Sequence, residues 1–279
     1  MDKTTLGDRM KNNYENITRY YLTRRMPVII RLDMKAGHTF TKGMKKPFDD
    51  IFVKTMQDTM KYLCENIQGC VLGYTQSDEI SLVLTDYAEL TTDAWFGNNL
   101  QKMCSVSASM ATMAFNKFFS DQVQDFMYSC CGNLGDYILT EKQDDYNFAQ
   151  NVYFKKFYAA MFDSRVFTIP KEEVCNYLLW RQQDATRNSI QSIGQANFSQ
   201  KELHGKSCND IQDMLMIQKG INWNNYATTL KRGSCCIKKV DIQDEKVDIK
   251  IRSKWIIDNE IPIFSQDRNY INKLINIGD

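Results

Sequence analysis

Short apolar runs and amphipathic segments alternate along the first 170 residues of the chain. Four apolar runs predict buried strands, at residues 26–33, 69–76, 80–84 and 152–165. Three amphipathic segments, in which apolar side chains recur every three or four positions, predict helices at residues 5–22, 48–67 and 98–119. After the first helix the predicted order is therefore β-α-β-β-α-β, the ferredoxin-like arrangement of an α+β fold.

The last third of the chain continues without a low-complexity linker. Helical spacing extends over residues 171–195 and 207–218, and strand-like runs follow at residues 234–242 and 247–251. We therefore expect residues 1–170 to form the ferredoxin-like domain. Residues 171–279 should form a C-terminal extension of additional helices and strands that packs on this domain.

Composition and charge narrow the class of protein. The 279 residues include 35 Lys and Arg against 34 Asp and Glu, so the formal net charge is +1 and a nucleic-acid contact must be a local patch. No apolar run approaches the roughly 18 residues of a membrane span, and the N-terminus resembles no targeting signal. The nine cysteines contain no C-x-x-C pair. We expect no membrane partner and a reducing cytoplasmic location, with mitochondria as the alternative if the source is eukaryotic.

Three acidic residues fall where the predicted topology brings strand ends together. Asp33 ends the first strand, and Asp78 and Glu79 occupy the hairpin between the second and third strands. Because the first and third strands are neighbours in a ferredoxin-like sheet, these carboxylates should converge at one edge. Clustered carboxylates are best tolerated around cations, and Mg²⁺ prefers oxygen ligands completed by substrate phosphates. Polymerase palms and nucleotidyl cyclases bind two such ions. Ordinary solvated acids are the alternative.

The loop that follows Asp33 suits a polyphosphate. It contains Gly37 and five basic side chains, namely Lys35, His38, Lys42, Lys45 and Lys46. Glycine permits close approach of the backbone, and lysine supplies a positive point charge. This combination favours a triphosphate bound beside the acids, although a packed turn would explain His38 equally well.

Several stretches of the chain resemble the tRNA-His guanylyltransferase family, in the same order. They are residues 31–40 (RLDMKAGHTF), 46–47 (KP), 74–79 (YTQSDE), 162–165 (FDSR), 177–182 (YLLWRQ), 221–225 (INWNN) and 231–233 (KRG). The similarity covers nearly the whole chain. It implies a polymerase-type palm that adds nucleotides to RNA 5′ ends in the 3′-to-5′ direction. It also implies two Mg²⁺ ions, with ATP, GTP and other nucleoside triphosphates as substrates.

The resemblance also implies roles for individual residues. Asp33 and Asp78 would bridge the two metal ions, and Glu79 would assist at the same catalytic site. Met34 would offer its backbone carbonyl as a metal ligand, at a position where the family usually has glycine. The implied nucleotide-binding residues are Asp33, Met34, Lys35, Ala36, Gly37, His38, Lys46, Ser77, Asp78 and Lys102. Asn99 replaces a usual arginine shortly before Lys102, so phosphate contacts there should differ.

Basic residues beyond the nucleotide loop are the candidates for contact with tRNA phosphates. They are Arg165, Arg181, Lys231, Arg232, Lys238 and Lys239, and an ordinary basic surface is the alternative. Most of them belong to residues 171–279, so we expect this extension to contact RNA and to take part in oligomerisation. Relatives form dimers of dimers, which implies a homotetramer.

The clearest departure from the family follows the WRQQD motif at residues 180–184. Members that add the extra guanosine to tRNA-His continue with His-Ile-Asn-Asn-Leu-Tyr-Asn. Residues 186–192 read TRNSIQS instead, and only Asn188 is kept. This difference favours the guanylyltransferase-like branch, whose members repair 5′-truncated tRNAs by templated addition.

The implied reaction has two steps. A tRNA 5′-monophosphate attacks the α-phosphorus of ATP and releases pyrophosphate. The 3′-hydroxyl of an incoming nucleoside triphosphate then attacks the adenylylated end and releases AMP. Three alternatives stay open: a tRNA-His guanylyltransferase that adds the extra 5′ guanosine, a nucleotidyl or diguanylate cyclase with a similar palm, and a catalytically silent tRNA-binding protein.

Overall fold

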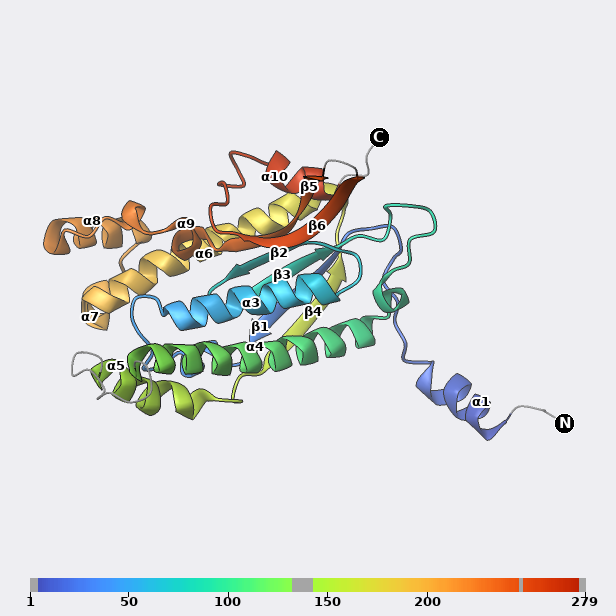
Figure 1. The fold of residues 1–279 in the computed structure, drawn as a ribbon, viewed down its shortest axis with the longest axis horizontal. Helices are drawn as coiled ribbons and strands as arrows, with labels where there is room; N and C mark the ends of the chain where they lie inside the picture. The colour runs from blue at the N-terminus through green and yellow to red at the C-terminus, as the bar shows by residue number, and fades with distance from the viewer. Residues whose placement is uncertain (1–4, 132–142, 246–247, 276–279) are drawn as a thin grey trace.

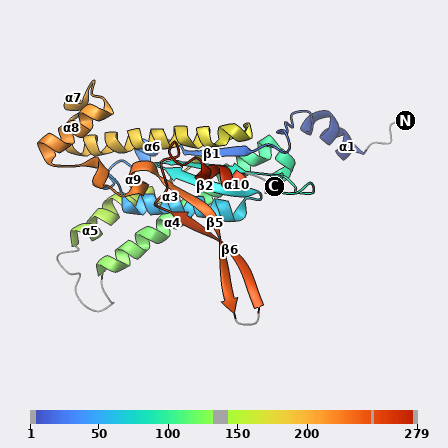
Figure 2. The ribbon, with the colours of Figure 1, turned by 90° about the horizontal axis from the view of Figure 1, so that it is seen from above.

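The computed structural model describes residues 5–131, 143–245 and 248–275, and a six-stranded sheet forms its centre (Figure 1). The strands are β1 (Val28–Met34), β2 (Cys70–Gln76), β3 (Glu79–Leu84), β4 (Phe162–Thr168), β5 (Ser234–Glu245) and β6 (Asp248–Asp258). Their order is β4-β1-β3-β2-β5-β6, with every neighbouring pair antiparallel. The first four strands confirm the predicted ferredoxin-like order, and β5 and β6 extend it as a hairpin that projects from the body (Figure 2).

Helices cover both faces of the sheet. The long helices α3 (Asp50–Asn66) and α4 (Leu100–Cys131) lie on one face, and α6 (Val174–Asn197) and α10 (Asn269–Ile275) lie on the other (Figures 1 and 2). The shorter helices are α1 (Leu6–Met10), α2 (Gly37–Phe40), α5 (Gln143–Phe148), α7 (Gln200–Leu203), α8 (Cys208–Lys219) and α9 (Thr228–Arg232). Single π or 3₁₀ turns occur at Lys11–Glu15, Trp95–Asn98, Ala149–Tyr153, Phe154–Lys156, Lys171–Glu173 and Trp223–Asn225.

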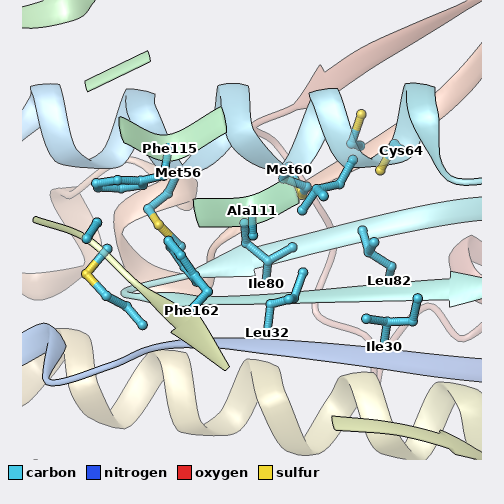
Figure 3. Close-up of a cluster of buried hydrophobic side chains, with 14 of the residues drawn as sticks. Ile30, Leu32, Met56, Met60, Cys64, Ile80, Leu82, Ala111, Phe115 and Phe162 are labelled. Atoms are coloured by element: carbon cyan, nitrogen blue, oxygen red, sulfur yellow. The ribbon is translucent and has the colours of Figure 1, made fainter. Parts of the chain in front are cut away.

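Alternating side chains of the strands build a separate core on each face of the sheet. On one face Ile30 of β1 packs in the cluster that contains Met56 of α3 (Figure 3). On the other face Ile29 joins a cluster with Leu178 of α6. Successive strand residues point to opposite faces, so the side chain of Asp33 lies on the α6 face. The chemistry predicted for Asp33 must therefore occur on that face.

Two predicted elements differ from the structure. The strand predicted at residues 152–165 begins only at Phe162, and residues 149–156 are helical. Ala149 and Tyr153, four positions apart, are both buried in the core, so the apolar spacing there is helical. The helix predicted at residues 5–22 ends at Glu15. Helices α3, α6 and α8 confirm the predicted segments to within a few residues, whereas α4, β5 and β6 are longer than predicted.

The sheet passes without interruption through the boundary expected near residue 170. Leu72 of β2 pairs with Ile237 of β5, so strands from residues 1–170 and 171–279 share one set of backbone hydrogen bonds. Cys236 and Trp255 also lie in the core cluster on the α3 and α4 face. Within the described ranges, none of the helices has the length and apolar character needed to cross a membrane.

Candidate active site

The end of β1 gathers carboxylates from three parts of the chain. Asp33 stands in register with Glu79 of β3 and with Asp163 of β4. Asp78 lies in the turn between β2 and β3, where its carbonyl accepts the Met34 amide at 3.1 Å. Burial raises the pKa of Asp33, and the negative charge of Asp78 raises it further. The carboxylates of Asp33 and Asp78 are therefore close enough to repel each other, as the strand order predicts.

The loop after Asp33 packs directly against Asp78. A Cβ atom added to Gly37 would lie 1.9 Å from Asp78 Oδ2, so only glycine leaves room for this carboxylate. Ala36 and Ser77 both adopt the left-handed conformation, with φ of 54° and 49°. Two tightly turned segments therefore meet at Asp78 and fix its position relative to the nucleotide loop.

Glu79 has different surroundings, although it follows Asp78 directly. Its Oε2 accepts hydrogen bonds from Arg31 at 2.6 Å and from Arg181 of α6 at 3.0 Å. Burial raises the pKa of Glu79, and the two guanidinium groups oppose that rise. Glu79 Oε1 and the Nε atoms of both arginines are buried without a hydrogen-bond partner. Glu79 is thus tied to two arginines, whereas Asp33 and Asp78 remain accessible on the α6 face.

The pair Asp33 and Asp78 fits a cation whose other ligands are water and substrate phosphates. Across the described part of the chain, no group of three or more His, Cys, Asp or Glu could hold a metal ion. Mg²⁺, however, commonly uses one or two carboxylates and completes its shell with water and substrate phosphates. The repulsion that raises the pKa of Asp33 also favours a cation between the two groups. These two residues therefore fit a magnesium ion that binds together with a triphosphate.

A cavity of about 620 Å³ lies beside Asp78, toward β2 and β5. The predicted nucleotide-binding residues His38, Lys46 and Ser77 line it. Asn188, the one residue kept from the family signature, lines it from α6. Its dimensions suit a small-molecule ligand, and its lysines suit phosphate. Lys35, Ala36, Gly37 and Met34 lie in the adjoining loop and strand end, not among the lining residues.

Asp163 and Arg165 lie on the other side of the carboxylates, on the edge strand β4. Arg165 Nη2 is 3.5 Å from Asp163 Oδ2 and 4.0 Å from Asp33 Oδ2. The Arg165 side chain is 55% exposed, so it is free to reach a ligand as well as the acids. Neither Asp163 nor Arg31 was predicted as a site residue from the sequence. Both lie in stretches that resemble the family, residues 31–40 and 162–165, and the strand pairing places residues 31, 33 and 163 on one face.

Lys102, predicted to bind the nucleotide, does not lie in this group. Lys102 occupies the first turns of α4, with its Nζ 5.7 Å from the Phe96 ring. Ser107 and Thr112, one to three turns later in α4, contact the start of β4 through the Ser164 hydroxyl and the Phe162 amide. Lys102 therefore lies toward the far end of the sheet, and its part in nucleotide binding stays a prediction.

Arg181 and Lys231, which were predicted to contact RNA, are both buried. The Arg181 side chain is 4% exposed and pairs with Glu79 and Asp184. The Lys231 ammonium donates to the Asn224 carbonyl at 2.6 Å and is likewise buried. Both cationic groups therefore interact with other groups of the protein itself. Lys238 and Lys239 are exposed on β5, and Arg232 is half-buried.

Comparison with known proteins identifies the family. The tRNA-His guanylyltransferase (Thg1) family model matches residues 7–170. A bacterial tRNA-His guanylyltransferase (Thg1)-like protein, solved in complex with ATP, is 43% identical, with a TM-score of 0.77 and coverage of 98% of this chain and 100% of that one.

Two curated relatives match at lower identity. The tRNA-His guanylyltransferase of Saccharomyces cerevisiae is 26% identical over 77% of this chain and 84% of that protein. An uncharacterised protein of Acanthamoeba polyphaga mimivirus is 26% identical over 97% of this chain and 87% of that protein. The chain belongs to the tRNA-His guanylyltransferase (Thg1) family and is a nucleotidyltransferase.

Proposed function

We propose that this protein adds nucleotides in the 3′-to-5′ direction to the 5′ end of truncated tRNA, with the opposite strand of the acceptor stem as template. The observation that carries the proposal is the pair Asp33 and Asp78: Ser77, next to Asp78, lines a nucleotide-sized cavity, and Asp33 lies beside the edge strand β4. We infer that one substrate approaches from the cavity and the other from the edge strand. The 43% identity to a Thg1-like protein in complex with ATP supports a nucleotide in the cavity.

The residues of the site would bind the two substrates and neutralise the charge of their phosphates. Asp33 and Asp78, with the Met34 carbonyl, would hold two Mg²⁺ ions that polarise the α-phosphate and neutralise the departing pyrophosphate. His38, Lys46 and Ser77 would hold the triphosphate from the cavity side. Arg165 would leave Asp33 and bind the RNA phosphate, since its guanidinium is exposed and already at the site. The protein contributes position and charge, which is the main requirement of phosphoryl and nucleotidyl transfer.

A direct test supplies a tRNA that lacks its first nucleotide, together with ATP, Mg²⁺ and each nucleoside triphosphate in turn. We expect extension only by the base complementary to the opposing strand, with release of AMP. The variant Asp33→Asn should give no product. Extension by all four nucleotides would contradict templating, and addition of guanosine only to intact tRNA-His would favour the guanosine-adding alternative.

Two further incubations separate the remaining alternatives. With ATP or GTP and Mg²⁺ but no RNA, a cyclic nucleotide product would favour the cyclase interpretation. With α-labelled ATP and a 5′-monophosphorylated tRNA, tight binding without transfer of label would favour a silent tRNA-binding protein.

We propose a dimer of dimers for the active form, to be measured by light scattering in solution.

A further inference from the structure

A half-exposed tryptophan lies next to the carboxylates on α6. Trp180 is 51% exposed, and the Arg181 guanidinium lies against its ring with Cζ 3.5 Å from the ring centroid. Tyr177 contacts the same ring edge-on, with centroids 6.0 Å apart. One side of the indole is therefore covered by a buried cation, and about half of the side chain is exposed to solvent.

The ring is held in a fixed position relative to the carboxylates. Arg181 is bound by Glu79 at 3.0 Å and approaches Asp184 at 3.5 Å, so the guanidinium under the indole cannot move freely. Glu79 directly follows Asp78 and stands opposite Asp33 in the β1–β3 pairing. Trp180 is thus joined to the catalytic edge through the ion pair of Arg181 with Glu79, in which both side chains are buried. A rigid aromatic surface binds a flat ligand with little loss of conformational entropy.

Trp180 also lies on the side of the carboxylates away from the cavity. Arg31 of β1 is 5.7 Å from the indole centroid, and Arg31 pairs in register with Arg165 of β4. The cavity occupies the β2 and β5 side of Asp78, whereas β1 and β4 occupy the other side. The side chains of Asp163 and Arg165 are more than half exposed, so α6 leaves this part of the sheet uncovered.

We propose that the exposed face of Trp180 stacks on the 5′-terminal base of the RNA, while Arg165 contacts the adjoining phosphate. The proposal rests on the function proposed above, because that reaction requires an RNA end and a nucleotide to meet at Asp33 and Asp78. The cavity accommodates the nucleotide, which leaves the β1 and β4 side for the RNA. Stacking suits this role, since every base has a π face and a templated enzyme must accept any terminal base.

The test compares Trp180→Ala and Trp180→Phe with the wild-type protein on a truncated tRNA that carries 2-aminopurine at its 5′ end. Trp180→Ala should raise KM for the RNA about tenfold, which corresponds to about 1.4 kcal/mol of lost stacking. The KM for ATP and the kcat should stay within about twofold of wild type, because a contact made equally in ground and transition states changes KM alone. Trp180→Phe should restore most of the RNA affinity.

A direct readout of stacking does not depend on activity. Binding should quench the 2-aminopurine fluorescence with the wild-type protein and with Trp180→Phe, but not with Trp180→Ala. If Trp180→Ala fails to fold, Trp180→Leu keeps apolar volume without a π face and serves in its place. Tyr14→Ala is the matched control, because Tyr14 is 66% exposed and lies in the turn Lys11–Glu15 that follows α1. Helix α1 projects away from the sheet (Figure 1).

Two results would overturn the proposal. One is an unchanged KM for RNA together with full quenching in Trp180→Ala. The other is a changed oligomeric state in Trp180→Ala with unchanged RNA affinity, which would make this face a contact between copies of the chain. If the wild-type protein extends no RNA at all, the proposed function fails instead, and the fluorescence titration still decides whether Trp180 stacks on an RNA end.

Discussion

Arg181 of α6 donates to Glu79 of β3 across 3.0 Å, at a point where both side chains are buried. Arg31 shares the same acceptor oxygen at 2.6 Å. One carboxylate of the predicted catalytic trio is therefore neutralised by two arginines, and the helix that carries Arg181 is fixed over the catalytic edge. Glu79 is thus bound to two arginines, and we propose Asp33 and Asp78 as the carboxylates that bind cations.

We expect Arg181→Met to destabilise the protein by about 1.5–3 kcal/mol, because buried Glu79 loses one of its two charge-assisted hydrogen bonds while Arg31 still compensates its charge. Urea unfolding measures the change in free energy. Arg187→Met is the control, since Arg187 is exposed and pairs with Asp184 at the surface, where such pairs contribute about 1 kcal/mol or less. Equal losses in the free energy of unfolding would show that the buried pair of Arg181 with Glu79 contributes no more than the surface pair of Arg187 with Asp184.

Asp33→Asn should abolish nucleotide addition and yet stabilise the protein without divalent cations. Burial and Asp78 raise the pKa of Asp33, so the ionised form is disfavoured in the folded state. At neutral pH the neutral asparagine removes this unfavourable charge. The gain should shrink as the pH falls through the raised pKa and should vanish below the ordinary value of 3.8, where Asp33 is protonated in both states.

Thermal unfolding with and without Mg²⁺ checks this prediction. Added Mg²⁺ should raise the melting temperature of the wild-type protein in the presence of ATP, because a ligand that binds only the folded state stabilises it. Asp33→Asn should respond much less. A variant that melts below wild type at pH 7 in the absence of cations would count against repulsion between Asp33 and Asp78.

Gly37→Ala should impair catalysis without unfolding the protein. Its new Cβ would lie 1.9 Å from Asp78 Oδ2 and must displace that carboxylate. A displacement of this size is expected to lower kcat on the order of 100-fold. Gly7→Ala is the matched control, since the nearest atom to its Cβ is Thr5 Oγ1 at 3.8 Å. Normal activity in Gly37→Ala would mean that the Asp78 position is not critical.

Lys46→Ala and Lys102→Ala should have different effects on ATP. Lys46 lines the cavity, so its loss should raise KM for ATP about tenfold through the missing phosphate contact. Lys102 lies on the first turns of α4, beside Phe96, and its loss should leave KM within about twofold. Initial-rate measurements with varied ATP decide between them. A large effect of Lys102→Ala would indicate that this lysine reaches the cavity of another copy.

The local pattern of the sequence was enough to predict the sheet and its acidic edge. Apolar runs mark β1, β2 and β3, and their order places Asp33 beside the hairpin that carries Asp78. The pattern failed at residues 152–156, where a strand was predicted but the segment is helical, with Tyr153 buried and the adjacent Phe154 exposed. Short apolar runs have this ambiguity because burial alone does not reveal the backbone period.

The sequence by itself determined the strand order, the meeting of Asp33 with Asp78, and the glycine beside them. Only the tertiary structure decided what surrounds these residues. It pairs Glu79 with Arg181, leaves Trp180 half exposed above Arg31, and carries Lys102 away from the site. The physical reason is that strand pairing follows from short-range periodicity, whereas the reach of a helical side chain depends on where its helix begins along the sheet.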